Sequence, residues 1–478
     1  MRRQIVLLAI GLFCLPVFLK AQAVTTVSSW MSSSPEKTWE KRSTAKIETA
    51  SANTVVDFEV FPTALEQKID GFGGCFNELG WDALKAIKPE QREQILKELF
   101  DKNSGCKFSI CRMPIGANDY SVDWYSLNET KGDFEMKNFS INRDKQRLVP
   151  YIKAAQKYRP DLKVWASPWC PPSWLKVNNH YACTADARVN DLPKEGQGVE
   201  MTTQFRMEPE YLKAYAIYFR KFIEAYRMEG IPIFAVHVQN EMNSCQVFPS
   251  CVWRPEDLNT FIGKYLGPEL KKTNAELWLG TVERPQFERV NVMLSDPISS
   301  KYIKGVGFQW AGKGAIAAIH QAYPSLKLMQ SETECGNGSN DWSAAEYTFG
   351  LMKHYLNNGA NAYMYWNMVL DETGKSQWGW KQNSMISITK STGSVVYNPE
   401  FFLMKQLSRS VLPSSYKIKS SGSFERNICF LSPDRKKLIL MVNNIENTNK
   451  DIHVKISDQL LTATLKPHSI NTFEVVLK

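Results

Sequence analysis

The feature that most constrains the fold is a regular alternation of short apolar segments with amphipathic ones. Eight apolar segments follow one another, at 69–74, 107–114, 162–168, 233–239, 276–282, 303–309, 326–332 and 360–367. Several are almost uninterrupted apolar runs, which is typical of parallel strands buried on both faces. Stretches with apolar residues at helical spacing lie between them, at 82–100, 143–158, 210–228, 254–271 and 343–357.

This alternation predicts an α/β protein in which residues 67–400 form a (β/α)8 TIM barrel. An open, doubly wound sheet alternates in the same way. That fold usually carries a glycine-rich phosphate-binding turn after its first strand, and Gly71, Gly73 and Gly74 lack the G-x-G-x-x-G spacing of such a turn. We therefore expect the barrel.

The sequence outside this region predicts a second, β-rich domain. Residues 401–478 contain strand-like runs at 437–442, 452–456 and 472–477, with turn signals at 432–434 and 467–468 and no helical stretch between them. An alternating run at 54–61 precedes the barrel, so we expect residues 24–66 to add the first strand or strands of a discontinuous β-sandwich side domain. The Ser/Thr-rich residues 23–44 are expected to form a flexible leader.

The first 23 residues have the layout of a secretory signal peptide. Arg2 and Arg3 precede an apolar run at 5–19, and Ala21-Gln22-Ala23 follows it. The run is shorter than the roughly 20 residues that a membrane-spanning helix needs. We expect a secreted or periplasmic protein without a membrane span.

Composition and charge exclude several classes of function. Apolar residues make up 43% and charged residues 22% of the chain, as in an ordinary globular protein. The net charge of +9 is spread along the sequence without a Lys/Arg-rich block, so nucleic acid is not an expected partner. The six histidines are scattered, and neither Cys-x-x-Cys nor His-Glu-x-x-His occurs, so we expect no metal site.

The cysteines predict no disulfide scaffold. Cys14 lies in the predicted signal peptide, and the cysteines that remain are odd in number, so at least one of them is unpaired within the chain. Cys245 and Cys251 bracket a short loop and form one candidate pair, and Cys170 and Cys183 form another. Spacing alone does not decide between paired and free thiols.

Two glutamates at the ends of separate predicted strands are the strongest candidates for catalysis. In a TIM barrel the working residues lie at the carboxyl ends of the strands. Glu241 follows the fourth predicted strand and Glu332 ends the seventh, so both side chains project into one mouth. Paired carboxylates cleave glycosidic bonds, and Trp and Asn side chains bind sugar rings and hydroxyls. Both glutamates are alternatively ordinary loop carboxylates, but their pairing and Asn240 beside Glu241 favour catalysis.

Four stretches of the chain resemble glycoside hydrolase family 30, which includes glucosylceramidases and β-1,6-glucanases. They are 71–80 (GFGGCFNELG), 110–121 (ICRMPIGANDYS), 166–176 (ASPWCPPSWLK) and 238–241 (VQNE), and residues 331–335 and 365–367 match more loosely. The resemblance covers most of residues 67–400. It implies a (β/α)8 barrel joined to a β-sandwich built from both ends of the chain, and an enzyme without metal or organic cofactor.

The resemblance also implies roles for the two carboxylates. Glu241 corresponds to the general acid/base, and Glu332 corresponds to the nucleophile of a retaining mechanism. Arg112 is placed to hold the nucleophile ionised, although a purely structural ion pair is an equal alternative. Glu334 lies on the same strand face as Glu332, so alternation does not separate them, and the Ser-Glu start of the motif favours Glu332.

Further residues are implied to bind the sugar. Glu78 resembles an acidic residue that binds sugar hydroxyls, and Trp169, Asn240 and Trp366 resemble other residues of the sugar site. Trp310 is expected to line the site as well. The sequence departs from the family at Gln309-Trp310-Ala311, where relatives often carry His-Trp-Tyr, and Ala311 leaves the aglycone side open or differently filled.

The sequence thus predicts a retaining glycosidase that cleaves β-D-glucosidic linkages in a β-1,6-glucan, a β-glucoside or a glucosylceramide. The substrate partner is an oligosaccharide, a polysaccharide or a glycolipid. The alternatives are a carbohydrate-binding protein with little turnover, a transglycosidase, and the same chemistry on a β-xyloside, a β-fucoside or a β-galactan. Endo or exo action and the oligomeric state stay open.

Overall fold

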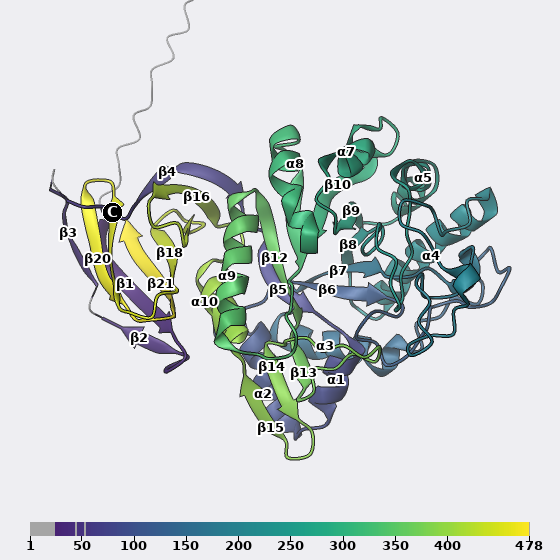
Figure 1. Cartoon of the computed structure of the whole chain (residues 1–478), viewed down its shortest axis with the longest axis horizontal. Coiled ribbons are helices and arrows are strands. Elements are labelled where there is room, and N and C mark those ends of the chain that lie inside the picture. Colours follow the sequence, from purple (N-terminus) through teal and green to yellow (C-terminus); the bar gives the residue numbers. More distant parts are fainter. Residues whose placement is uncertain (1–23, 44, 52–53, 478) are drawn as a thin grey trace, which may run out of the picture.

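The apolar segments of the sequence form a closed barrel in the computed structural model, which describes residues 24–43, 45–51 and 54–477. In these residues eight parallel strands close a ring in chain order (Figure 1). They are β5 (Gly71–Cys75), β6 (Ile110–Ile115), β7 (Lys163–Pro168), β8 (Ile233–His237), β9 (Glu276–Val282), β10 (Ile303–Gln309), β11 (Lys327–Glu332) and β12 (Ala360–Asn367). The predicted TIM barrel is confirmed. The signal peptide predicted at 1–23 lies outside the described residues.

Helices surround this barrel, and the first amphipathic stretch differs from its prediction. Residues 82–100 are not one helix: α1 (Glu78–Lys85) ends and α2 (Pro89–Phe100) begins anew. Pro89 explains the break, because proline has no N–H and suits the first turn of a helix. The others are α3 (Leu148–Tyr158), α4 (Pro209–Met228), α5 (Pro255–Phe261), α6 (Gly267–Leu270), α7 (Phe287–Ser295), α8 (Ile316–Ala322), α9 (Trp342–Asn357) and α10 (Pro399–Ser410).

The barrel interior is filled by large rings. The ring of His237 stacks between Trp165 and Trp278, with centroid distances of 4.1 and 5.5 Å. Gly307 makes room for this stack, because a Cβ there would lie 2.5 Å from the His237 ring. Burial lowers the pKa of His237 well below its usual value, so the ring stays neutral. The stack therefore fills the inside of the barrel, where Trp165 and Trp278 belong to a buried core.

The side domain draws its strands from both ends of the chain. Within the described residues, ten strands form a sheet in the order β2-β1-β21-β18-β17-β16-β4-β19-β20-β3, seen beside the barrel in Figure 1. Apolar side chains from β18 and β21 share one core with those from β19 and β20, so the sheet folds over on itself. The predicted discontinuous β-sandwich is confirmed. The strands are β1 (Val24–Ser33), β2 (Glu40–Arg42), β3 (Lys46–Thr49), β4 (Phe58–Lys68), β16 (Tyr416–Gly422), β17 (Asn427–Leu431), β18 (Lys437–Asn444), β19 (Lys450–Ile456), β20 (Gln459–Leu465) and β21 (Ser469–Leu477).

The expectation of a flexible leader over residues 23–44 is wrong for the part that the structure describes. β1 pairs antiparallel with β21, and its Trp30 is buried, stacked on Phe473 at 4.8 Å. The Trp30 indole N–H donates to Asn471 Oδ1 at 3.0 Å. The serines and threonines of this strand suggested a linker, but Thr and Val suit a strand, and one buried tryptophan anchors it.

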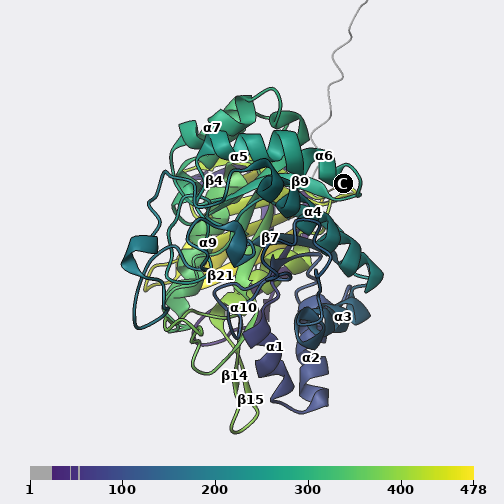
Figure 2. The same ribbon diagram turned by 90° about the vertical axis from the view of Figure 1, so that its right-hand side faces the viewer.

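Helix α10 joins the barrel to the side domain. Its Gln406 amide donates to Ser33 Oγ at 2.6 Å and to the Ile470 carbonyl at 3.0 Å, and it accepts from Thr472 Oγ1 at 2.7 Å. A small sheet of β13 (Val369–Asp371), β14 (Ile386–Thr389) and β15 (Ser394–Tyr397) follows the barrel, and its β14–β15 hairpin projects away from the body (Figure 2). Among the described helices, none is both long and apolar enough to cross a membrane.

Replacement of Trp30 by alanine tests the role of β1. We expect Trp30→Ala to lower the free energy of unfolding of the side domain by about 3–5 kcal/mol, because it leaves a cavity in the core and removes the donor to Asn471 Oδ1. Denaturant unfolding followed by circular dichroism measures this change. Val55→Ala is the control, since Val55 is 77% exposed and its truncation should change stability by less than about 0.5 kcal/mol. Equal stability of both variants would show that β1 adds little.

Candidate active site

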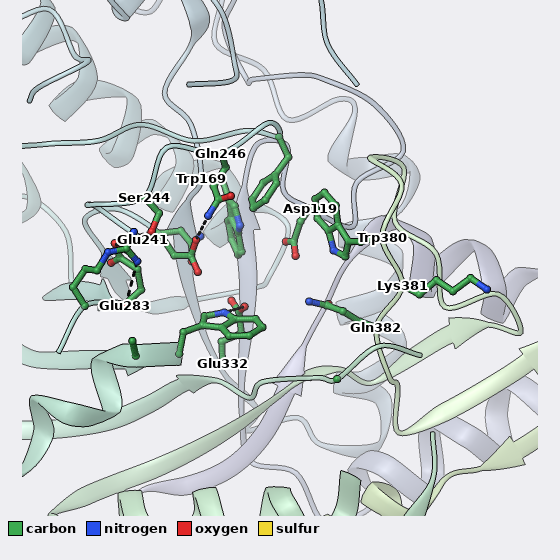
Figure 3. Close-up of a pocket in the computed structure, with 16 residues that line it drawn as sticks. Asp119, Trp169, Glu241, Ser244, Gln246, Glu283, Glu332, Trp380, Lys381 and Gln382 are labelled. Atoms are coloured by element: carbon green, nitrogen blue, oxygen red, sulfur yellow. Dashed lines mark hydrogen bonds and ion pairs between the residues drawn. The ribbon is translucent and has the colours of Figure 1, made fainter. Parts of the chain in front are cut away.

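The carboxyl ends of the barrel strands and the loops beyond them enclose a cavity of about 530 Å³. Carboxyl groups of Asp119, Glu241 and Glu332 point into its space (Figure 3). The lining residues are Asp119, Trp169, Asn240, Glu241, Ser244, Gln246, Phe248, Glu283, Arg284, Trp310, Ala311, Glu332, Gly336, Trp380, Lys381 and Gln382. The mouth is therefore acidic, amide-rich and aromatic, as expected of a surface that binds sugars.

Glu332 ends β11 and is held by three N–H donors. Arg112 Nη1 donates to Glu332 Oε2 at 2.7 Å, and the Gln309 amide donates to the same oxygen at 3.2 Å. The indole N–H of Trp310 donates to Oε1 at 3.2 Å. These donors favour the ionised carboxylate, whereas burial favours the neutral acid.

Glu241 stands on the turn that follows β8. Its Oε1 accepts from Gln309 at 3.2 Å and its Oε2 accepts from Gln246 at 3.2 Å. Its backbone has a positive φ of 48°, and its N–H donates to Thr281 Oγ1 at 3.1 Å. Positive φ is uncommon for a glutamate, so this hydrogen bond helps to hold a conformation that aims the side chain into the cavity.

Arg112 on β6 is the centre of the polar network. It is fully buried, and its Nη2 donates to Asn240 Oδ1 at 2.7 Å and to Ser167 Oγ at 2.9 Å. Its guanidinium carbon lies 4.3 Å from the ring centroid of Trp169 and 5.2 Å from that of Trp366. A buried cation thus joins one carboxylate, two polar side chains and two tryptophans in one rigid unit.

Burial and mutual repulsion govern the protonation of the two glutamates. Burial raises the pKa of Glu332 to about 7; Arg112 opposes this rise, and Glu241 adds to it. Burial also raises the pKa of Glu241, whose two amide donors lower it only in part. Because Arg112 forms its ion pair with Glu332, we expect a proton shared by the pair to favour Glu241.

Asn240 and Gln382 present amide groups to the cavity. The Asn240 oxygen already accepts from Arg112, from Thr281 at 3.0 Å and from Gln309 at 3.3 Å, so its NH₂ group is left to donate to a ligand. The Gln382 oxygen accepts from Asn367 Nδ2 at 3.0 Å, which turns its NH₂ group into the cavity (Figure 3). Both amides are therefore pre-oriented as hydrogen-bond donors.

The structure adds lining residues that the sequence reasoning did not single out. Asp119 is 5% exposed, one of its carboxyl oxygens has no partner among the described groups, and burial raises its pKa well above the usual value. Glu283 accepts from the Asn243 N–H at 2.9 Å and from Ser244 Oγ at 3.0 Å, and burial raises its pKa to about 7. Asp119 and Glu283 each follow a predicted strand closely, and this position is the sequence signal that could have identified them as site residues.

Three residues named from the sequence as sugar-binding groups or as the alternative nucleophile do not line the cavity. Glu78 is buried at the start of α1, where its Oε2 accepts from the Val122 N–H at 2.8 Å and pairs with Arg143 at 3.2 Å. Trp366 is fully buried and packs on Trp169 at 5.4 Å. Glu334 pairs with Lys313 and accepts from the Tyr347 hydroxyl at 2.6 Å. The described residues contain no group of three or more His, Cys, Asp or Glu side chains able to hold a metal ion.

The TIM barrel and its acidic, aromatic mouth are together typical of hydrolases that cleave carbohydrates. Comparison with known proteins agrees with this class. The sequence model of the glycosyl hydrolase family 30 TIM-barrel domain matches residues 69–411. The chain therefore belongs to glycosyl hydrolase family 30.

Individual relatives are distant but cover most of the chain. Lysosomal acid glucosylceramidase of Mus musculus is 26% identical over 85% of this chain and 81% of its own length. Endo-1,6-beta-D-glucanase BGN16.3 of Trichoderma harzianum is 25% identical over 82% of this chain and 80% of its own length. The crystal structure of SrfJ from Salmonella typhimurium has the same fold, with a TM-score of 0.83 at 23% identity, over 93% of this chain and 98% of that one.

Replacement of Arg112 tests its control of Glu332. Arg112→Met removes the cation that lowers the pKa of Glu332, so this pKa should rise by about 1–3 units. A smaller fraction of Glu332 is then ionised at a given pH, and the acid limb of the pH profile of kcat/KM should move to higher pH. We expect kcat/KM to fall about 100-fold. Arg112→Lys keeps a charge and should shift the limb less; an unshifted limb in folded Arg112→Met would contradict this role.

Proposed function

We propose that this protein is a retaining β-glycosidase in which Glu332 is the nucleophile and Glu241 is the general acid/base. The observation that carries this proposal is the Gln309 amide nitrogen, which lies 3.2 Å from an oxygen of each glutamate. Because both oxygens bond to one nitrogen, they lie no further apart than twice 3.2 Å, at or below the lower end of the range of about 6.5–9.5 Å that an inverting enzyme needs for its water. This geometry favours direct attack by a carboxylate.

The hydrogen bonds support the division of roles. A nucleophile must be ionised, and Glu332 has the ion pair with Arg112 and the Trp310 indole donor. An acid must hold a proton near neutral pH, and Glu241 has neutral amide donors and no ion pair of its own. Glu334 faces Lys313 outside the cavity, which favours Glu332 over Glu334 as the nucleophile.

The proposed reaction has two displacements. A Glu332 oxygen bonds to the anomeric carbon while the bond from that carbon to the leaving oxygen breaks, and this oxygen takes the proton of Glu241. Water then gives a proton to the Glu241 carboxylate, and its oxygen replaces Glu332 at the anomeric carbon. Asp119, Asn240 and Gln382 are the groups we propose for the hydroxyls of the bound sugar, with Trp169 against the ring.

Covalent trapping tests the mechanism. An activated 2-fluoro β-glucoside should leave a stable glycosyl ester on Glu332, because the fluorine slows the second displacement, and peptide mass spectrometry locates it. Glu334→Gln is the matched control and should be labelled at Glu332 as efficiently as the wild type. An adduct on Glu334 would overturn the assignment, and a folded protein that is never labelled would favour the carbohydrate-binding alternative or another sugar.

For the substrate, we propose a β-1,6-glucan. The outer part of the cavity carries Trp380 and Phe248, whose rings lie 4.8 Å apart, together with the charged side chains of Arg284 and Lys381. Aromatic faces flanked by charged groups suit a further sugar unit better than an acyl chain, which needs a continuous apolar wall. The relative from Trichoderma harzianum bears the name of an endo-1,6-beta-D-glucanase, which agrees with this choice.

The same site is compatible with a β-glucosyl unit on another aglycone, so the second candidate substrate is a glucosylceramide. It is favoured by similarity to the mouse lysosomal acid glucosylceramidase, which covers most of both chains. The exposed mouth and its small Ala311 side chain leave space beside Trp310 for either aglycone.

Replacement of Trp380 tests whether its ring binds a further sugar unit of the glucan. Trp380→Ala should lower kcat/KM for β-1,6-glucan about tenfold, because one stacking face is lost, and should leave an aryl β-glucoside within about threefold. Trp380→Phe keeps a ring face and should retain most activity. Faster wild-type hydrolysis of glucosylceramide than of the glucan would reject the glucan proposal.

We also propose that the protein is exported. The support is the predicted signal peptide at residues 1–23, which has two arginines, then an apolar run, and small alanine residues at its end. An enzyme outside the cytoplasm meets polymeric glucan directly. Fractionation of expressing cells, with and without residues 2–23, tests the export.

A further inference from the structure

Two cysteines from distant parts of the chain meet beside the active-site mouth. Cys183 lies in the loop after β7 and Cys245 in the loop after β8, and the two thiols are near enough for each to shift the pKa of the other. The backbone fixes this approach, because the N–H groups of Cys183 and Thr184 both donate to the Gln246 carbonyl, at 3.0 and 2.9 Å. Gly198 donates to the Cys183 carbonyl at 2.7 Å, and a Cβ on Gly198 would lie 3.2 Å from Cys245 Sγ.

The surroundings of this pair contain a buried cation. Lys176 is fully buried, and its ammonium donates to the carbonyls of Tyr181, Ala182 and Ser250 at 3.0, 3.0 and 2.7 Å. The interaction with the Cys245 side chain, and then the charge of Lys176, lower the pKa of the Cys183 thiol to about 5, against the effect of burial. A thiolate is the nucleophilic form of cysteine.

We propose that Cys183 and Cys245 form a disulfide bond that ties the loop after β7 to the loop after β8. The short-range pairs considered from the sequence are less well placed. The thiol of Cys170 donates to the Pro171 carbonyl at 3.1 Å and that of Cys251 is directed to the Val252 carbonyl. The thiol of Cys183 likewise donates to the Ser250 carbonyl at 3.3 Å, and all three residues are buried, so the backbone contact beside Cys245 is what favours the new pair. Cys245 is half-buried and is the member of the new pair that an oxidant can reach.

The bond forms by ordinary thiol–disulfide exchange. Cys245, the more exposed of the two thiols, gives up its proton and attacks a small disulfide such as oxidised glutathione, which releases one glutathione as a thiol and leaves a mixed disulfide on Cys245. The Cys183 thiolate then attacks the Cys245 sulfur and expels the second glutathione. Two cysteine thiols are oxidised, one glutathione disulfide is reduced to two thiols, and the two protons pass to the glutathione sulfurs.

The bond would act on the part of the mouth that these loops form. Gln246, adjacent to Cys245, donates to Glu241 Oε2, and Ser244 and Phe248 of the same loop line the cavity. A disulfide at Cys245 would therefore hold in place Gln246, the hydrogen-bond donor to Glu241, and Phe248, whose ring pairs with that of Trp380. This consequence rests on the proposed function, whereas the bond itself does not.

Peptide mapping tests the bond. The purified protein is equilibrated with oxidised and reduced glutathione, its free thiols are alkylated, and the unreduced digest is analysed by mass spectrometry. We expect one linked peptide pair containing Cys183 and Cys245, which disappears after reduction. Cys183→Ser and Cys245→Ser should abolish it, and Cys429→Ser, in β17 of the side domain, should retain it.

Thermal unfolding gives a second readout. Reduction should lower the Tm of the wild type and of Cys429→Ser by at least about 2 °C and leave the Tm of Cys245→Ser unchanged. Full alkylation of both cysteines after oxidation, or a link from either one to Cys170 or Cys251, would overturn the proposal. The peptide map of the wild type tests the disulfide even where a variant fails to fold. A protein that contains the linked peptide but shows no glycosidase activity would contradict only the proposed function.

Discussion

The site depends on one buried cation in a mouth of carboxylates. Arg112 contacts groups at the ends of neighbouring and distant strands: Ser167 of β7, Asn240 after β8, Gln309 of β10 and Glu332 of β11. A buried ion pair is costly to desolvate, and loss of one partner typically costs about 3–5 kcal/mol because the other charge is left without compensation. Arg112 therefore constrains both the shape of the mouth and the charge of Glu332.

The electrostatics of the mouth follow from that arrangement. Asp119, Glu241, Glu283 and Glu332 all line one cavity, and burial raises the pKa of each. Like charges so close cannot all ionise, so the position of the cation decides which one does. Arg112 lies against Glu332 and Arg284 lies near Glu283, so we expect the proton shared by Glu241 and Glu332 to favour Glu241. The acid and the nucleophile proposed here would thus arise from chemically identical side chains through their neighbours.

The parallel strands could be predicted from the sequence because buried parallel strands leave apolar runs at regular spacing. The choice of a closed barrel over an open sheet also needed the missing G-x-G-x-x-G turn and the family motifs. Strand β1 could not, because its serines and threonines resemble a linker until the pairing with β21 is known. The two carboxylates were found because strand ends converge on one mouth. Gln309 and Gln246 were not recognised as their hydrogen-bond donors, since an amide has no distinctive pattern in sequence. Strand alternation could not separate Glu332 from Glu334; the family motif favoured Glu332, and the ion pair of Glu334 with Lys313 outside the cavity agrees.

The two sides of the mouth are built differently, which bears on how specificity arises. Of the groups proposed for chemistry, Glu332 ends β11 and Glu241 lies on the short turn after β8. The Trp165–His237–Trp278 stack lies next to the guanidinium of Arg112, which pairs with Glu332. The outer wall is made of loop residues, among them Phe248 and Trp380, which no strand fixes. Loops tolerate change far better than barrel strands do, so this family can retain one reaction while the aglycone varies. A bond between Cys183 and Cys245 would lie on the loop side, where rigidity has to be supplied by something other than the barrel.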